Sequence, residues 1–184
     1  MQSKDGDARY FCKPDDFASL FGFVRANDKY LSDYCTAGGK GPGFEDNPYK
    51  NGFPVEFANT NLCAVLRAVS GKKDAPVIIH LVDWTAGEHG PVALKLKADS
   101  FFPGKKLSIS LRTPKAYDAA AHAAAEAAAQ KMLKKGELLG AAQASAYEPL
   151  VQETALKTTD SGEWVQVTVP AISPWGLLVV KPQN

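Results

Sequence analysis

The residues best suited to chemistry in this chain follow one apolar run, "PVIIHLVDW", at residues 76–84. Asp83 and Trp84 end the run, and the next loop, "TAGEHG", supplies Glu88 and His89. An indole ring can cover the apolar C–H face of a sugar while carboxylate and imidazole groups meet its hydroxyls. Loops at strand ends often carry function. We therefore predict that these four residues form a carbohydrate-binding site.

A second polar group, "GFEDNPYKNG", places Glu45, Asp46 and Asn47 close to Tyr49. Carboxylates beside an aromatic ring suit a sugar, and their oxygens also suit a structural calcium ion. We therefore add Tyr49 to the predicted carbohydrate site and leave structural calcium open. The alternative is a turn in which the Asp and Asn side chains bond to nearby backbone.

His80 lies in the middle of the apolar run. Alternation puts Ile78, His80, Val82 and Trp84 on one face of a strand, and both faces are largely apolar, so we expect a central strand. A buried neutral imidazole needs partners for its nitrogens. We interpret His80 as a structural histidine that bridges the sandwich to a loop or a neighbouring domain.

Trp84 also has a structural alternative. It can cap the hydrophobic core together with Trp164 and Trp175.

Catalysis finds little support in the sequence. Glycoside hydrolysis needs two carboxylates roughly 5 to 10 Å apart, and the spacing of Glu45, Asp46, Asp83 and Glu88 selects no pair. The chain contains neither GxSxG nor HExxH, and "GGKGPG" lacks the GK[ST] ending of a phosphate loop. We therefore predict no catalytic residue, no metal-ligating residue and no cofactor.

Alternating segments predict most of the elements that would position these residues. "NLCAVLRAVSG" and "VIIHLVDW" suggest a hairpin, "PVALKLKA", "KLSISLRTP" and "EWVQVTVP" alternate, and "WGLLVVKP" suggests a doubly buried last strand. Such strands separated by turns are typical of an antiparallel β-sandwich of jelly-roll or immunoglobulin-like type. The predicted fold class is therefore mainly β.

Two helical segments interrupt this pattern. Residues 14–27 carry an apolar stripe of Phe17, Leu20, Phe21 and Val24. The alanine-rich segment 116–146 predicts a surface helix over 118–135, inserted between two strands and ending near a glycine. Residues 36–54 form a turn-rich segment without periodicity. We expect an annex of helix and loop at 1–54 and a sandwich at 55–184 that carries the insertion.

Composition narrows the function classes. The 184 residues carry a net charge of +1, which argues against a nucleic-acid or anionic-membrane partner. No apolar stretch approaches the roughly 18 residues that span a bilayer. The first residues lack the apolar core of a signal peptide, and we expect a piece of a longer protein.

The chain has three cysteines, Cys12, Cys35 and Cys63. The sequence leaves open whether two of them form one disulfide, such as Cys12 to Cys35, or all three are thiols.

The order of these segments resembles the tail of large (β/α)8-barrel glycoside hydrolases of the dextranase and cycloisomaltooligosaccharide glucanotransferase type. The similarity runs through "DDFASLFGFVRANDKYL", the hairpin ending in "VIIHLVDW", and the late "WVQVTVPAISPWGLLVVKP". Asp83 stands where that family commonly has asparagine, and the alanine-rich insertion is unusual. The resemblance implies a bacterial, secreted or periplasmic protein whose catalytic carboxylates lie on a barrel domain outside this chain.

Three functions are compatible with these observations. The first is a non-catalytic accessory module of a carbohydrate-active enzyme that is structural and binds a polysaccharide or oligosaccharide. The second is a small self-contained glycoside hydrolase that uses a carboxylate pair. The third is a protein-interaction or assembly domain that docks through its alanine-rich helix.

Overall fold

A computed structural model describes residues 14–41, 52–58, 61–85 and 90–183 of the chain. The chain forms two compact units. The first combines Met1–Lys29 with Pro114–Val151, and the second combines Tyr30–Thr113 with Gln152–Asn184. The segment 1–54, which the sequence suggests as an annex, is divided between the two units. We describe the units separately, the second as the sandwich unit and the first as the helical unit.

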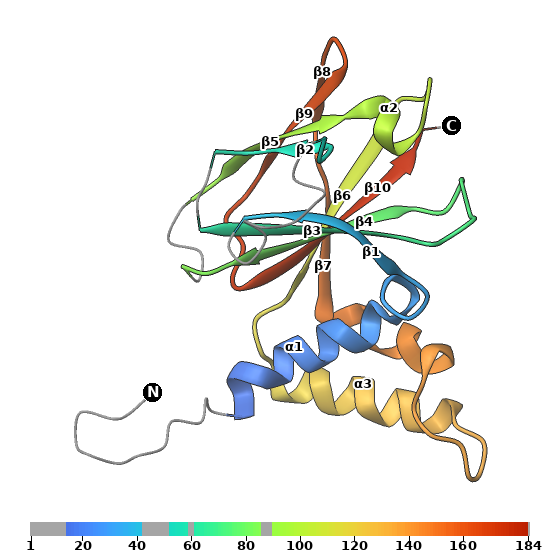
Figure 1. Cartoon of the computed structure of the whole chain (residues 1–184). Coiled ribbons are helices and arrows are strands. Elements are labelled where there is room, and N and C mark those ends of the chain that lie inside the picture. The colour runs from blue at the N-terminus through green and yellow to red at the C-terminus, as the bar shows by residue number, and fades with distance from the viewer. Residues whose placement is uncertain (1–13, 42–51, 59–60, 86–89, 184) are drawn as a thin grey trace. The chain divides into compact units, whose positions relative to one another are not determined.

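The sandwich unit contains two β-sheets (Figure 1). The larger sheet has six strands in the order β1-β3-β4-β10-β6-β7. Their bounds are β1 Cys35–Lys40, β3 Leu62–Ala68, β4 Val77–Asp83, β10 Trp175–Pro182, β6 Leu107–Pro114 and β7 Val151–Ala155. The smaller sheet has four strands in the order β2-β5-β9-β8. Their bounds are β2 Val55–Glu56, β5 Val92–Lys97, β9 Trp164–Val169 and β8 Thr158–Ser161.

The hydrophobic core lies between these two sheets. Buried side chains from both sheets form one cluster, which includes Leu81, Leu94, Ile109, Val167 and Leu178. The alternation read from the sequence places these residues correctly, because every second side chain of a strand points to the same face. In β5, for example, Val92, Leu94 and Leu96 are buried while the residues between them are exposed. The predicted antiparallel β-sandwich with small helical parts is confirmed.

The strand β4 is central, as its sequence predicts. It pairs antiparallel with β3 on one side and with β10 on the other. Ile79 and Leu81 point into the core between the sheets. Ile78 points to the opposite face of the sheet and is also fully buried. Both faces of β4 are therefore covered, which explains its almost continuous apolar sequence.

The strand β1 was not predicted, because it falls in the turn-rich segment 36–54. It pairs antiparallel with β3, and its register shifts between Thr36 and Gly38, which leaves Ala37 as an extra residue. Such a bulge removes the period-2 pattern that a sequence search needs. Backbone pairing with β3, rather than side-chain alternation, determines this strand.

The helical unit contains α1 (Pro14–Ala26), α3 (Ala119–Met132) and the 3-10 segment η3 (Ala141–Leu150). A short 3-10 turn η1 (Asp28–Tyr30) follows α1, and a single helical turn α2 (Ala98–Phe101) belongs to the sandwich unit. Helix α3 ends at Met132, three residues before the predicted end at residue 135. Leu133 already has an extended backbone, so the lysines and Gly136 that follow lie beyond the helix.

The apolar stripe of α1 is mostly not its buried face. Phe17, Phe21 and Val24 are exposed, whereas Phe23 and Ala26 are fully buried. The close approach at Gly22 explains this choice: a Cβ atom there would lie 2.6 Å from Leu150 Cδ1 and 3.0 Å from His122 Cε1. Only a residue without a side chain allows α1 to lie this close to η3 and α3.

Candidate functional site

The predicted carbohydrate site lies where β4 ends. The Asp83 side chain is buried, at 3% exposure, and its Oδ1 accepts hydrogen bonds from the Thr85 amide (2.8 Å) and hydroxyl (2.7 Å). The Asp83 amide donates to the carbonyl oxygen of Pro174 at 2.8 Å. An aspartate that bonds to the backbone two residues on is typical of a tight turn. Asp83 therefore holds the exit of the strand in place.

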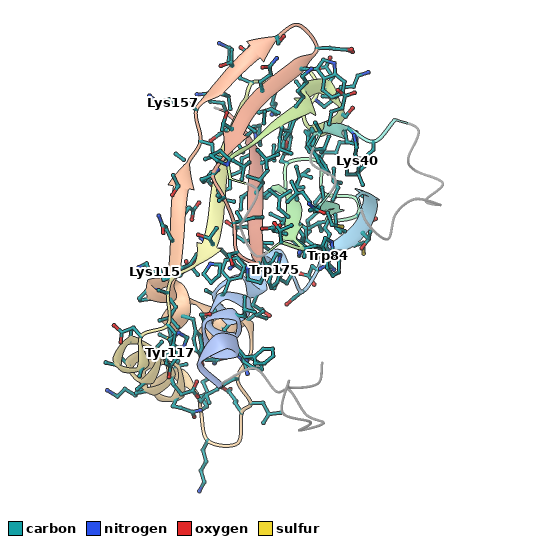
Figure 2. The ribbon with its side chains drawn as sticks, turned by 90° about the vertical axis from the view of Figure 1, so that its left-hand side faces the viewer. Lys40, Trp84, Lys115, Tyr117, Lys157 and Trp175 are labelled. Atoms are coloured by element: carbon teal, nitrogen blue, oxygen red, sulfur yellow. The ribbon has the colours of Figure 1, made fainter. Side chains whose placement is uncertain are left out.

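Trp84 is the exposed side chain at this exit. Its backbone amide donates to the Asn61 carbonyl at 3.1 Å, while its side chain is 65% exposed. Figure 2 labels Trp84 and Trp175 at the same end of the sandwich unit, which agrees with the pairing of Trp175 with Val82. Trp84 therefore does not cap the core. A fixed backbone presents its indole ring to the outside.

His80 precedes this exit on strand β4, and its ring stacks on Trp175. The two ring centroids are 5.6 Å apart and the ring planes are inclined by 19°. Burial, with a smaller effect from the charge on Arg67, lowers the pKa of His80 from 6.5 to about 4. The imidazole is therefore neutral at pH 7. Its role as a structural residue of the sheet agrees with the sequence interpretation.

The polar bridge expected from His80 finds no support at its Nε2 atom. Within the described residues, the buried Nε2 atom of His80 has no hydrogen-bond partner. An imidazole in this position gains its contacts from the indole face rather than from a hydrogen-bonded network. Because its pKa is lowered, the His80 imidazole is a poor proton acceptor at pH 7. This property does not favour His80 as a catalytic base.

Of the five residues in the predicted carbohydrate site, the structure describes two: Asp83, whose side chain is buried, and Trp84, whose side chain is exposed. Tyr49, Glu88 and His89 lie outside the described residues. The same holds for Glu45 and Asp46 of the hydrolase alternative. Asp83, the fourth carboxylate of that alternative, is the buried turn residue described above.

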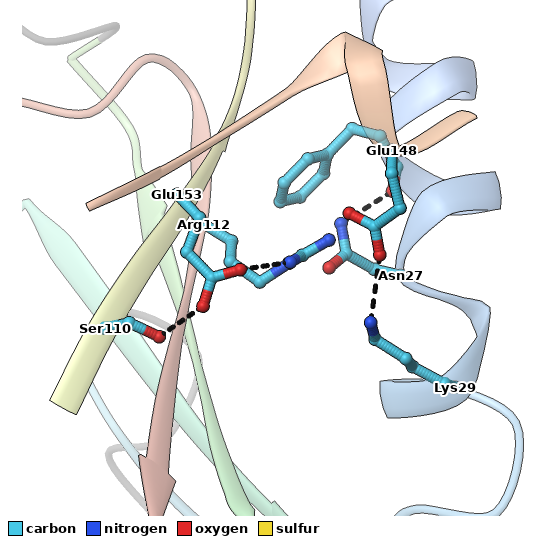
Figure 3. Close-up of polar contacts among 7 residues, drawn as sticks. Asn27, Lys29, Ser110, Arg112, Glu148 and Glu153 are labelled. Carbon is cyan, nitrogen blue, oxygen red and sulfur yellow. Dashed lines mark hydrogen bonds and ion pairs between the residues drawn. The ribbon is translucent and has the colours of Figure 1, made fainter. Parts of the chain in front are cut away.

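A polar cluster on strand β6 was not predicted from the sequence. Glu153 of β7 accepts a hydrogen bond from the Ser110 hydroxyl at 2.8 Å and forms an ion pair with Arg112 (Figure 3). Arg112 is 2% exposed, and its guanidinium lies 5.6 Å from the centre of the Tyr30 ring. The signal was present in "LSISLRTP", where an arginine occupies an alternating position of a strand.

Glu153 is ionised by this arrangement. Burial alone would raise the pKa of Glu153, but the hydrogen bonds from Ser110 and Arg112 and the charge of Arg112 lower it below its usual value. The carboxylate compensates a nearly buried guanidinium, which is what a buried arginine requires. We interpret the cluster as structural. The other ion pair drawn in Figure 3, between Lys29 and Glu148 at 2.9 Å, is solvent-exposed.

Two features are absent from the described residues. No group of three or more His, Cys, Asp or Glu side chains lies close enough together to hold a metal ion. None of the helices in the described part of the chain has the length and hydropathy needed to cross a membrane. Of the cysteines, Cys35 is exposed and Cys63 is buried, while Cys12 lies outside the described residues.

Comparison with solved structures finds a distant structural similarity. No protein-family model matches the chain, and no curated protein matches it by sequence. A solved structure, alpha-L-fucosidase isoenzyme 2 from Paenibacillus thiaminolyticus, is similar over 74% of this chain, with 12% sequence identity and a TM-score of 0.37. The matched region spans 16% of the fucosidase chain.

Proposed function

We propose that this chain is a non-catalytic accessory module of a carbohydrate-active enzyme, with a glycan-binding surface at the exit of β4. The observation that supports this proposal is the geometry of Trp84. Its backbone is fixed by a hydrogen bond to Asn61, and its ring is 65% exposed. An indole face that is open to solvent on a hydrogen-bonded backbone offers an apolar platform to a pyranose ring.

The non-catalytic part of the proposal rests on how the described carboxylates of this region are used. Asp83 holds a turn, and Glu153 compensates Arg112. Neither resembles the pair of carboxylates that flank a scissile bond. The hydrolase alternative stays a prediction for Glu45, Asp46 and Glu88, and an activity screen of their Gln or Asn variants would test it.

The proposed partners are a polysaccharide or oligosaccharide and a catalytic barrel domain outside this chain. For the first partner, calorimetry against α-glucans and plant polysaccharides tests the binding of the wild type and Trp84→Ala. Loss of the ring should weaken binding roughly tenfold or more. Phe17→Ala, which removes an aromatic ring that is 47% exposed on α1, is the matched control and should bind normally. Equal affinities for Trp84→Ala and the wild type would contradict the glycan role of this surface.

A protein-interaction function is the second candidate, and one observation favours it. Of the seven large hydrophobic side chains that are exposed among the described residues, six belong to the helical unit. They are Phe17, Phe21, Val24, Tyr117, Met132 and Leu138. Exposed apolar side chains concentrated on one part of a protein often mark an interaction surface.

Self-association is the form of this second function that can be tested directly. Size-exclusion chromatography and sedimentation should show a dimer that dissociates in Leu138→Ser, whose side chain is 90% exposed in the native chain. A wild type that remains monomeric over the whole accessible concentration range would argue against assembly through this surface.

A further inference from the structure

A groove of about 500 Å³ lies on the helical unit. Its walls come from helix α1, helix α3, the segment η3 and Tyr117, and its lining does not include Trp84. The side chains of Ala18, Ala119 and Ala123 in its lining are small, whereas the space beside Gly22 is filled by Leu150 and His122. The three alanines leave room for a ligand to approach the helices closely.

Aromatic rings line this groove. Phe21 is 69% exposed and Tyr117 is 38% exposed, and both belong to its lining. Figure 2 labels Tyr117 beside α3. The imidazole of His122 packs against the Tyr117 ring, with the centroids 5.0 Å apart and the planes inclined by 45°. The contact restrains the tyrosine ring, so that an exposed aromatic face is held in place.

One cationic and one anionic side chain complete the lining. The Arg25 guanidinium makes a single long hydrogen bond within the described residues, from Nη1 to the Leu139 carbonyl at 3.4 Å. A guanidinium carries five N–H donors, so most of them remain available to a ligand. Glu126 offers the complementary acceptors on α3.

The carboxylate of Glu126 is held firmly. Its Oε2 accepts a hydrogen bond from the Tyr147 hydroxyl at 2.6 Å, and its Oε1 accepts one from Gln130 at 3.0 Å. These bonds lower the pKa of Glu126, while burial and the Glu126 carboxylate raise the pKa of Tyr147 to about 12. The tyrosine therefore stays protonated, and Glu126 stays ionised with a further lone pair on each oxygen.

We infer that this groove binds a neutral, hydroxyl-rich sugar ring, at a site distinct from Trp84. The exposed faces of Phe21 and Tyr117 suit the C–H face of a pyranose. Sugar hydroxyls can both accept from Arg25 and donate to Glu126, which a purely apolar peptide side chain cannot do. A carboxylate-bearing sugar would meet Arg25 favourably but would be repelled by Glu126.

This inference extends the proposed glycan role to a second site and rests on that role. The two can fail separately, because Trp84 does not line the groove. If the groove binds sugar and the exit of β4 does not, Trp84→Ala will have no effect while groove variants lose binding. The reverse pattern would leave the proposed function standing and remove the inference.

The test uses maltoheptaose, cellohexaose and xylohexaose as neutral probes and hexagalacturonate as a charged probe. Isotope-edited NMR of the full chain should show shifts at the amides of Gly22 and His122 with at least one neutral probe, and the shifts should persist in Trp84→Ala. Calorimetry should find roughly tenfold weaker binding in Trp84→Ala combined with Phe21→Ala or Tyr117→Ala than in Trp84→Ala alone.

Two further variants sharpen the result. Phe17→Ala removes an exposed phenylalanine of the same helix that does not line the groove, so it should leave the affinity unchanged. Glu126→Gln keeps the shape of the side chain but removes its charge. It should weaken the binding of the neutral probe and strengthen the binding of hexagalacturonate. The inference is overturned if no neutral probe shifts these amides, if Phe21→Ala and Tyr117→Ala bind normally, or if hexagalacturonate is the tighter ligand of the wild type.

Discussion

The imidazole of His80 and the indole of Trp175 are stacked, with their centroids 5.6 Å apart. They belong to adjacent strands, since His80 of β4 pairs with Leu177 of β10, two residues beyond Trp175. The stack lies beside the turn held by Asp83, whose amide donates to the carbonyl oxygen of Pro174. The histidine in the centre of the apolar run thus supports the strand end that presents Trp84.

The first prediction concerns the pH dependence of stability. Burial, with a smaller effect from the charge on Arg67, lowers the pKa of His80 from 6.5 in the unfolded chain to about 4 in the folded chain. Between these values the unfolded state binds more protons, so stability falls as the pH decreases. The free energy of unfolding should decrease by about 2 to 3 kcal/mol by pH 4 because of His80.

Urea denaturation at pH 7 and at pH 4.5 measures this loss. His80→Phe retains a ring against Trp175 and removes both the titration and the unsatisfied Nε2 atom. It should therefore unfold with a smaller difference between the two pH values. An unchanged pH dependence in His80→Phe would show that other groups cause it.

The second prediction concerns the ion pair of Arg112 and Glu153. Glu153→Gln removes the charge that compensates a guanidinium whose side chain is 3% exposed. The expected loss is about 1 to 3 kcal/mol, below that of a fully buried pair because the Glu153 side chain is 41% exposed. The lowered pKa of Glu153 means that its contribution is present above pH 4.5 and is lost as the pH falls further.

Lys97 and Glu163 provide the matched comparison. They form a pair at 3.1 Å whose side chains are 44% and 61% exposed. Glu163→Gln should change the free energy of unfolding by less than about 0.5 kcal/mol. Equal effects of the two glutamine substitutions in urea denaturation at pH 7 would contradict the importance that we assign to burial.

The third prediction concerns Gly22. In an isolated helix, Gly→Ala would stabilise by up to about 1 kcal/mol. Here the new methyl group would lie 2.6 Å from Cδ1 of Leu150, which is 4% exposed and has little room to move. Gly22→Ala should therefore destabilise the protein by about 1 to 3 kcal/mol in thermal or urea unfolding.

Gly140→Ala is the control for this substitution. The nearest atom to a Cβ at Gly140 is Gln143 Oε1 at 3.9 Å, and the backbone there is extended. Gly140→Ala should therefore hardly change the free energy of unfolding. A stabilising Gly22→Ala would mean that helix propensity outweighs the close approach of the helices.

The fourth prediction concerns the start of α3. The Asp118 side chain accepts hydrogen bonds from the amides of Ala120 at 2.9 Å and Ala121 at 3.0 Å. Asp118→Ala leaves these amides without that acceptor and should cost about 1 kcal/mol. Asp118→Ser keeps an acceptor and should recover most of the loss. Unfolding curves that are the same for both variants would rule out capping as the cause.

Sequence reasoning identified the elements with a regular pattern. The alternating residues of β5, β6 and β9 point inward as expected, and β4 is central because both of its faces are apolar. Trp84 was correctly placed at a strand end, where the structure leaves it 65% exposed. The residue pattern could not predict the bulged strand β1 or the ion pair of the buried Arg112, because both depend on partners distant in the chain.

The sequence by itself determined the sandwich and its core, because alternation and helix propensity are properties of a few neighbouring residues. Only the tertiary structure decided which face of α1 is buried, and it chose Phe23 over the apolar stripe of Phe17 and Phe21. The physical reason is close packing: Gly22 lets α1 approach Leu150, which is distant in the sequence. Contact between distant residues also made His122 part of a groove, although no residue near it in the chain predicts a binding site.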